Sequence, residues 1–126
     1  MKISIVIPSY NQGKFIRRTI DSILNQGYPD LELIVMDGGS TDETLAILQS
    51  YGDRIAWHSA PDSGQTQAVN NGWKRATGQI LGWVNSDDIL LPGALRAAVD
   101  RFQSQPEIQW LYGNCRYIDA RDRVLG

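Results

Sequence analysis

The sequence lacks the features that would assign it to several specialised classes of protein. It has a single cysteine, Cys115, so no disulfide can form within the chain. No apolar run approaches the roughly 20 residues that a membrane-spanning helix needs. Twelve basic residues stand against fourteen acidic ones, and no basic block marks a nucleic-acid surface. These absences favour a globular protein without nucleic-acid binding, which we expect to be cytoplasmic.

The chain has 126 residues, enough for one domain with a hydrophobic core, and no linker or repeat divides it. We therefore treat 1–126 as a single domain. The run at 3–7 is apolar and β-branched, as a strand buried on both faces should be, and further strands are predicted at 31–36, at 54–59, where Ile55 and Trp57 alternate with Ala56 and His58, and in the apolar run at 80–84.

Helical spacing of apolar residues follows each of these runs, at 15–26, beyond Ser40, at 65–76 and at 92–103. Ser40 and Glu43 fit a capping box for the second helix. The alternation predicts an α/β fold with three layers, α/β/α, around a mostly parallel sheet. A fifth strand at 108–112 and an extended hairpin arm at 116–124 should follow.

Small polar and acidic residues come directly after each predicted strand. Because parallel strands end at one edge of a sheet, and such sheets bind ligands there, this edge is the predicted site. The four segments are Pro8-Ser9-Tyr10-Asn11, Asp37-Gly38-Gly39-Ser40, Ala60-Pro61-Asp62-Ser63-Gly64 and Asn85-Ser86-Asp87-Asp88.

Asp87 and Asp88 are adjacent carboxylates at the end of an apolar strand. Most such pairs are simply solvated or cap a turn, but these two lie beside other acids at the predicted site. Carboxylate oxygens suit Mg²⁺ or Mn²⁺, which accept phosphate oxygens as further ligands. We therefore predict that the pair holds a divalent cation that bridges to a diphosphate.

The remaining segments are compatible with both a structural and a functional role. Asp37-Gly38-Gly39-Ser40 is a plausible strand-to-helix turn, yet the carboxylate of Asp37 could also accept from a base or a ribose hydroxyl. Gln65 opens a helix whose positive end could meet phosphate or sugar, and Asn70 follows on the same helix. On their own, Asp62, Gln65 and Asn70 are weak signals.

Taken together, four motifs resemble the family-2 glycosyltransferases of the GT-A fold in both order and spacing. They are Ile5-Val6-Ile7-Pro8-Ser9-Tyr10-Asn11, Val35-Met36-Asp37-Gly38-Gly39-Ser40-Thr41-Asp42, Asp62-Ser63-Gly64-Gln65 and Asn85-Ser86-Asp87-Asp88. The resemblance covers Lys2 to about Asp119. It implies inverting transfer of a sugar from a nucleotide-diphosphate donor to a saccharide or lipid-linked acceptor, with Mn²⁺ or Mg²⁺, in the cytoplasm or at the inner face of the membrane.

The resemblance also implies roles for individual residues. Pro8, Ser9 and Tyr10 correspond to a loop that lines the nucleoside, and Asp37 to an aspartate that hydrogen-bonds the base. Asn85, Ser86 and Asp87 lie over the family's Asp-x-Asp motif, with Asp88 as an extension. Asn85 replaces the first acid, which leaves Asp87 and Asp88 as metal ligands, and Gly38 replaces a second aspartate found in many members.

In this family the general base belongs to a second, acceptor-binding half. Because Glu107, Asp119 and Asp122 fit no base motif, we expect no catalytic base in this chain and place it after Gly126. We expect the chain alone to bind donor without transferring sugar. Apolar surface near 108–112 and Trp110 should then be exposed and could pair two copies.

Three further classes of protein share parts of this pattern. A nucleotidyltransferase should show a glycine-rich phosphate loop after the first strand, where this chain has Pro8-Ser9-Tyr10-Asn11. A receiver domain should carry its acids after the first strand and a lone aspartate after the third. A non-catalytic module that binds nucleotide sugars remains the serious alternative.

Overall fold

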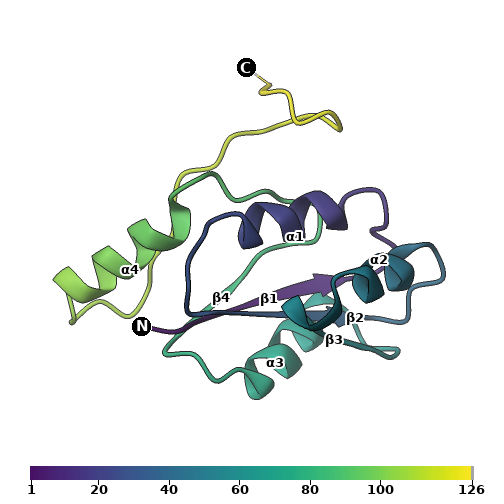
Figure 1. Cartoon of the computed structure of the whole chain (residues 1–126), viewed down its shortest axis with the longest axis horizontal. Helices are drawn as coiled ribbons and strands as arrows, with labels where there is room; N and C mark the ends of the chain where they lie inside the picture. Colours follow the sequence, from purple (N-terminus) through teal and green to yellow (C-terminus); the bar gives the residue numbers. More distant parts are fainter. Residues whose placement is uncertain (126) are drawn as a thin grey trace.

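The computed structural model describes residues 1–125, which form a four-stranded sheet with helices on both faces (Figure 1). The order across the sheet is β3-β2-β1-β4, and all three pairings are parallel. The predicted three-layer α/β/α architecture is confirmed. The elements are β1 (Ile3–Ser9), α1 (Ile16–Leu24), β2 (Leu31–Asp37), α2 (Thr44–Ser50), the short 3-10 helix η1 (Gly52–Arg54), β3 (Ala56–Ser59), α3 (Gln65–Arg75), β4 (Ile80–Trp83) and α4 (Ala94–Ser104).

The central strand β1 is buried along its whole length and contributes side chains to two core clusters. Alternate residues of a strand face opposite sides of the sheet. Ile3, Ile5 and Ile7 pack with buried residues of α1, α2 and α4 in the larger cluster. Val6 packs with β2 and α3 in the smaller one. Figure 1 accordingly shows α1 and α2 on one side of the sheet and α3 on the other.

Helix α3 approaches the sheet closely because it carries a glycine at the contact. A Cβ atom at Gly72 would lie 2.5 Å from Cγ1 of Val6 and 3.1 Å from Cγ of Met36. The helix therefore lies closer to β1 and β2 than any side chain at position 72 would permit. This depth fixes where Gln65, the first residue of α3, meets the ends of the strands.

The strand expected at 108–112 is absent from the described structure, so that prediction is wrong. An apolar run forms a strand only where a partner strand can take its backbone hydrogen bonds. The four-stranded sheet ends at β4, and Trp110 and Tyr112 are 81% and 92% exposed. The hairpin arm is confirmed in reduced form, as one antiparallel bridge between Ile118 and Val124.

The capping box predicted at Ser40 is also wrong. The Ser40 hydroxyl donates to Oδ1 of Asp37 at 2.5 Å and so faces back toward β2. Helix α2 begins only at Thr44, whose backbone N–H donates to Oδ1 of Asp42 at 3.0 Å. A buried carboxylate that needs donors outcompetes the helix end for the serine.

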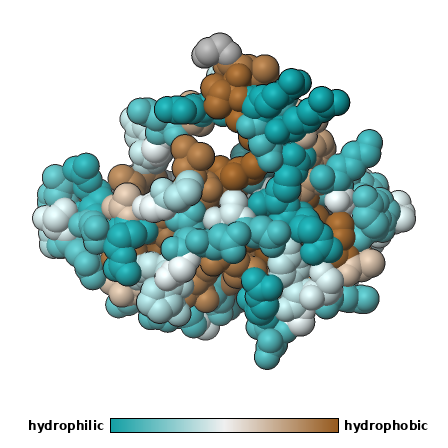
Figure 2. Space-filling view, turned by 45° about the horizontal axis from the view of Figure 1, so that its top comes forward, coloured by the Kyte–Doolittle hydropathy of each residue, from teal (hydrophilic) through white to brown (hydrophobic). Residues whose placement is uncertain are grey.

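Residues 105–125, hereafter the arm, run away from the sheet and over α1 (Figure 1). Figure 2 shows a hollow between the arm and the body, with apolar atoms along its walls. The predicted exposure of apolar side chains in this region is observed, and pairing of two copies stays a prediction. The large apolar residues of the arm that are exposed are Trp110, Leu111, Tyr112, Tyr117, Val124 and Leu125.

None of the helices within residues 1–125 combines the length and the apolar character that crossing a bilayer requires.

The depth of α3 leads to a stability prediction. Gly72→Ala should lower the free energy of unfolding by about 1–3 kcal/mol, because its methyl group overlaps Val6 and overpacked cores cost that much. Gly113→Ala is the matched control, since a Cβ there meets nothing within 4 Å. Urea unfolding followed by circular dichroism measures both. Equal stability of the two variants would contradict the close packing.

Candidate functional site

The carboxyl edge, where the four strands end, is organised around the carboxylate of Asp37. This side chain is 2% exposed. Its Oδ2 accepts from the backbone N–H groups of Gly39 at 3.0 Å and Ser40 at 2.8 Å, as in an Asx turn. The hydroxyls of Ser59 and Ser40 donate at 2.8 Å and 2.5 Å. Four donors therefore stabilise one buried charge and tie the end of β3 to the turn after β2.

The loop after β1 is joined to this turn by hydrogen bonds in both directions. The N–H of Gly38 donates to the carbonyl of Ser9 at 2.8 Å, and the N–H of Asn11 donates to Oγ of Ser40 at 2.8 Å. Tyr10 stands out from this loop with 59% of its surface exposed. Within residues 1–125, Oγ of Ser9 is the buried side-chain oxygen that has no hydrogen-bond partner. The structure thus brings Ser9, Tyr10 and Gly38 together, and their part in donor binding stays a prediction.

Asp62, in the loop after β3, lies directly over Gly38. A Cβ atom at position 38 would be 3.1 Å from both carboxylate oxygens of Asp62. Oδ1 of Asp62 accepts from the N–H of Gly64 at 3.0 Å, which holds the side chain in this position. The φ of Gly64 is +125°, a conformation that favours glycine.

The segment Asn85–Asp88, hereafter the acidic turn, follows β4 and is fastened to α3. The side-chain amide of Gln65 donates to Oδ1 of Asn85 at 2.8 Å, and the N–H of Asp88 donates to the carbonyl of Asn85 at 3.1 Å. Ser86 is buried within the turn. Asn85 is therefore engaged by Gln65, while the carboxylates of Asp87 and Asp88 belong to exposed residues.

Helix α1 supports the acidic turn from the other side. The hydroxyl of Thr19, which is fully buried, donates to the carbonyl of Asp88 at 2.6 Å. The hydroxyl of Ser22, one turn further, accepts from the N–H of Leu90 at 3.1 Å. In the sequence Thr19 falls among the regularly spaced apolar residues of this helix, so this contact was not predicted. A buried hydroxyl on an otherwise apolar face was the available signal.

The surroundings of Asp88 in the acidic turn disfavour the charged form of its carboxyl group. Partial burial, together with the negative charge of Asp87, raises the pKa of Asp88, and a hydrogen bond with Asn85 opposes the rise. Within residues 1–125 no three His, Cys, Asp or Glu side chains form a metal-binding group. Two adjacent oxygen donors nevertheless fit Mg²⁺ or Mn²⁺, which proteins often hold with one or two carboxylates plus substrate phosphates.

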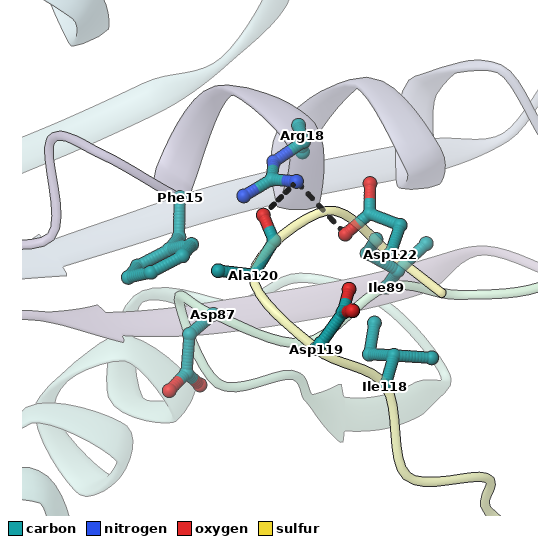
Figure 3. A pocket seen from close by; sticks show the side chains of 8 residues that line it. All are labelled: Phe15, Arg18, Asp87, Ile89, Ile118, Asp119, Ala120 and Asp122. Carbon is teal, nitrogen blue, oxygen red and sulfur yellow. Dashed lines mark hydrogen bonds and ion pairs between the residues drawn. The ribbon is translucent and has the colours of Figure 1, made fainter. Parts of the chain in front are cut away.

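A pocket of about 200 Å³ opens beside Asp87, between α1 and the arm (Figure 3). Phe15 and Arg18 line it from the start of α1, and Asp119 and Asp122 line it from the arm. The sequence did not point to Phe15 or Arg18, because one fitted the apolar face of the helix and the other an ordinary surface position.

Arg18 holds the arm in place beside this pocket. Its guanidinium donates to the carbonyl of Ala120 at 2.9 Å and lies 2.9 Å from Oδ1 of Asp122. In Figure 3 the carboxylate of Asp87 points away from this guanidinium. Hydrogen bonds from the backbone of Arg123 and Arg121 hold the pKa of Asp119 below its usual range. Asp119 is thus poorly suited to accept a proton.

Asn70 is a predicted site residue that lies further along α3 than Gln65, the other predicted site residue on that helix. It is exposed on α3, five residues beyond Gln65, which corresponds to about 7.5 Å of helix. Its part in donor binding stays a prediction.

Comparison with known proteins identifies relatives of this chain. Residues 4–122 match the family model described as Glycosyl transferase family 2. A chondroitin synthase of Escherichia coli is 36% identical over 98% of this chain and 18% of its own length. An uncharacterized glycosyltransferase of Nostoc is 30% identical over 99% of this chain and 40% of its own length. The chain therefore spans well under half the length of these relatives.

Solved structures show the same fold. TarS of S. aureus in complex with UDP-GlcNAc superposes with a TM-score of 0.76 at 28% identity, over 84% of this chain and 32% of that one. The mannosyltransferase PcManGT of Pyrobaculum calidifontis, in complex with GDP-Man and Mn²⁺, gives 0.74 at 25% identity, over 80% and 32%. On its sequence and its GT-A fold, the chain belongs to glycosyl transferase family 2.

Proposed function

We propose that this chain supplies the donor site of an inverting, metal-dependent glycosyltransferase that uses a nucleotide-diphosphate sugar. The observation that carries the proposal is the acidic turn. Two adjacent carboxylates, Asp87 and Asp88, are presented at the carboxyl edge of a parallel sheet and braced there by Gln65 and Thr19. The sugar nucleotides in the complexes of TarS and PcManGT, and the Mn²⁺ in the latter, support the same assignment.

The donor would lie across the edge from β2 to β4. Pro8, Ser9 and Tyr10 would line the nucleoside beside Gly38, where the unpartnered hydroxyl of Ser9 is available for a hydrogen bond. Asp37 would act mainly by ordering this turn through its four internal donors, and the expected contact with the base stays a prediction.

The diphosphate would lie at the other end of the edge, near the acidic turn. Asp87 and Asp88 would hold Mn²⁺ or Mg²⁺, and Gln65, Asn85 and Ser86 would keep the turn in position. The bound cation would neutralise the charge that develops on the departing diphosphate. This chain's own residues bind and orient the donor so that the anomeric carbon faces the acceptor.

The pocket beside Asp87 is the proposed place for the sugar end of the reaction. Its aromatic ring, guanidinium and carboxylates are groups that hold sugar hydroxyls and ring faces, and its volume of about 200 Å³ suits a single ring. Because hydrogen bonds hold Asp119 as a weak base, we propose that the general base for the saccharide or lipid-linked acceptor is a group other than Asp119. The competing function is donor binding without transfer of the sugar.

Removing the carboxylates of the acidic turn tests the proposal. In Asp87→Ala/Asp88→Ala the Mn²⁺-dependent part of sugar-nucleotide binding should disappear, because the cation loses both protein ligands. The melting temperature should hold or rise, since the burial and the repulsion that raise the pKa of Asp88 are both removed. Titration calorimetry with UDP-GlcNAc and GDP-Man, with and without Mn²⁺, measures the effect. Unchanged affinity and unchanged Mn²⁺ dependence would refute the metal site.

The support given by α1 can be tested separately. Thr19→Val keeps the side-chain shape but leaves the carbonyl of Asp88 without its buried donor, which should cost about 1–3 kcal/mol of stability. Mn²⁺-dependent donor binding should weaken as well, because the acidic turn loses a brace. Thr19→Ser keeps the hydroxyl and is the matched control. If Val and Ser variants bound Mn²⁺ and donor equally well, the brace would have no role in the site.

A further inference from the structure

We propose that Asp62 reads the donor's base, by accepting a hydrogen bond from an N–H group on the base's pairing edge. This inference rests on the proposed function, in which the carboxyl edge binds a nucleoside diphosphate. It assigns the selection of the base to a carboxylate from the loop after β3 and not to the aspartate that ends β2.

The carboxylate of Asp37 is already occupied. It is 2% exposed and accepts four hydrogen bonds from Gly39, Ser40 and Ser59. A base could bind it only by displacing one of these donors, which would leave a buried polar group unpaired at a cost of a few kcal/mol. The group that meets the base must therefore be a different one.

Gly38 leaves room at this point, and Asp62 fills it. A Cβ atom at position 38 would lie 3.1 Å from both carboxylate oxygens of Asp62. The φ of Gly38 lies outside the left-handed region, so its backbone does not itself require glycine. The missing side chain is needed instead for the approach of Asp62. Within the described residues Oδ1 of Asp62 accepts from Gly64, and Oδ2 accepts no hydrogen bond.

The layout of the strand ends places the base at Asp62. The acidic turn follows β4 and Gly38 follows β2, with β1 between them. Two strand spacings separate the ends, about 10 Å. An extended nucleoside diphosphate whose phosphates lie at the acidic turn covers this span with its base at the far end. Tyr10 follows the intervening β1 and exposes 59% of its surface, so its ring can contact the nucleoside on the way.

A carboxylate can only accept hydrogen bonds, which limits what it can select. Uracil offers the N3–H group and guanine the N1–H group, so both bases satisfy Asp62 and a methyl group on that nitrogen abolishes the contact. The test therefore pairs UDP with N3-methyl-UDP and GDP with N1-methyl-GDP, which distinguishes the two bases as well.

For the nucleotide that binds the wild-type chain more tightly, methylation should weaken binding about tenfold or more, the worth of a charge-assisted hydrogen bond. In Asp62→Ala the unmethylated nucleotide should lose a similar factor, and the methylation penalty should vanish. Asp53→Ala, at the opposite end of β3 in η1, is the matched control and should keep the full penalty. Affinity for Mn²⁺-pyrophosphate should be the same in all three proteins.

Substitutions at Gly38 test the geometry, because one substitution should have opposite effects on nucleotide affinity with and without the carboxylate of Asp62. Gly38→Asp should weaken nucleotide binding in the wild-type background, because its Cβ meets the carboxylate of Asp62 at 3.1 Å and two like charges adjoin. In the Asp62→Ala background the same change should strengthen binding and restore the methylation penalty. Gly38→Ala supplies the Cβ without the carboxylate and should restore neither. Thermal melts confirm that each variant is folded.

The outcomes separate this inference from the function on which it rests. No binding of any nucleoside diphosphate by the wild-type chain would overturn the proposed function. Wild-type binding with an undiminished methylation penalty in Asp62→Ala would overturn the role of Asp62 alone. A penalty that vanished in Asp37→Asn and persisted in Asp62→Ala would return the base contact to Asp37.

Discussion

The buried carboxylate of Asp37 is the interaction on which the rest of the site depends. A charge that is 2% exposed can persist only if hydrogen bonds replace the water it has lost, and four donors do so. Those donors come from the turn after β2 and from the end of β3. Satisfying the charge therefore fixes the path of both segments, and Gly38 with them. The position of the loop after β1 is fixed as well, because its backbone is hydrogen-bonded to Gly38 and Ser40.

The acidic residues at the carboxyl edge lie in two different environments. The carboxylate of Asp37 is stabilised by hydrogen bonds from within the chain and thereby becomes part of the framework. Asp87 and Asp88 lie side by side with only Asn85 bonded to Asp88, and partial burial together with the charge of Asp87 raises the pKa of Asp88. The first arrangement gives the edge a rigid shape, and the second leaves two charges that a cation would stabilise. A donor that carries both a nucleoside and a diphosphate needs both kinds of surface.

Much of this organisation could be predicted from the sequence. The apolar strand at Ile3–Ile7 and the polar segments after each strand were enough to predict the sheet and its binding edge, because periodicity and strand direction are local properties. Long-range competition was not visible. Ser40 fits a helix cap, yet the buried Asp37 claims its hydroxyl. Residues 108–112 have a strand's composition, but pairing needs a partner that no pattern within the run reveals. Thr19 and Arg18 matter through contacts with segments about 70 and 100 residues away.

The carboxylate that orders the framework and the carboxylates proposed to bind the ligand are separate groups on one edge of the sheet. Crystals of the chain grown with Mn²⁺ and UDP would test it most directly, through the anomalous signal of manganese. We expect a peak bound by Asp87, Asp88 or both together with diphosphate oxygens, while Asp37 keeps its bonds to Gly39, Ser40 and Ser59. A manganese peak on the carboxylate of Asp37, with the acidic turn left free of metal, would contradict it.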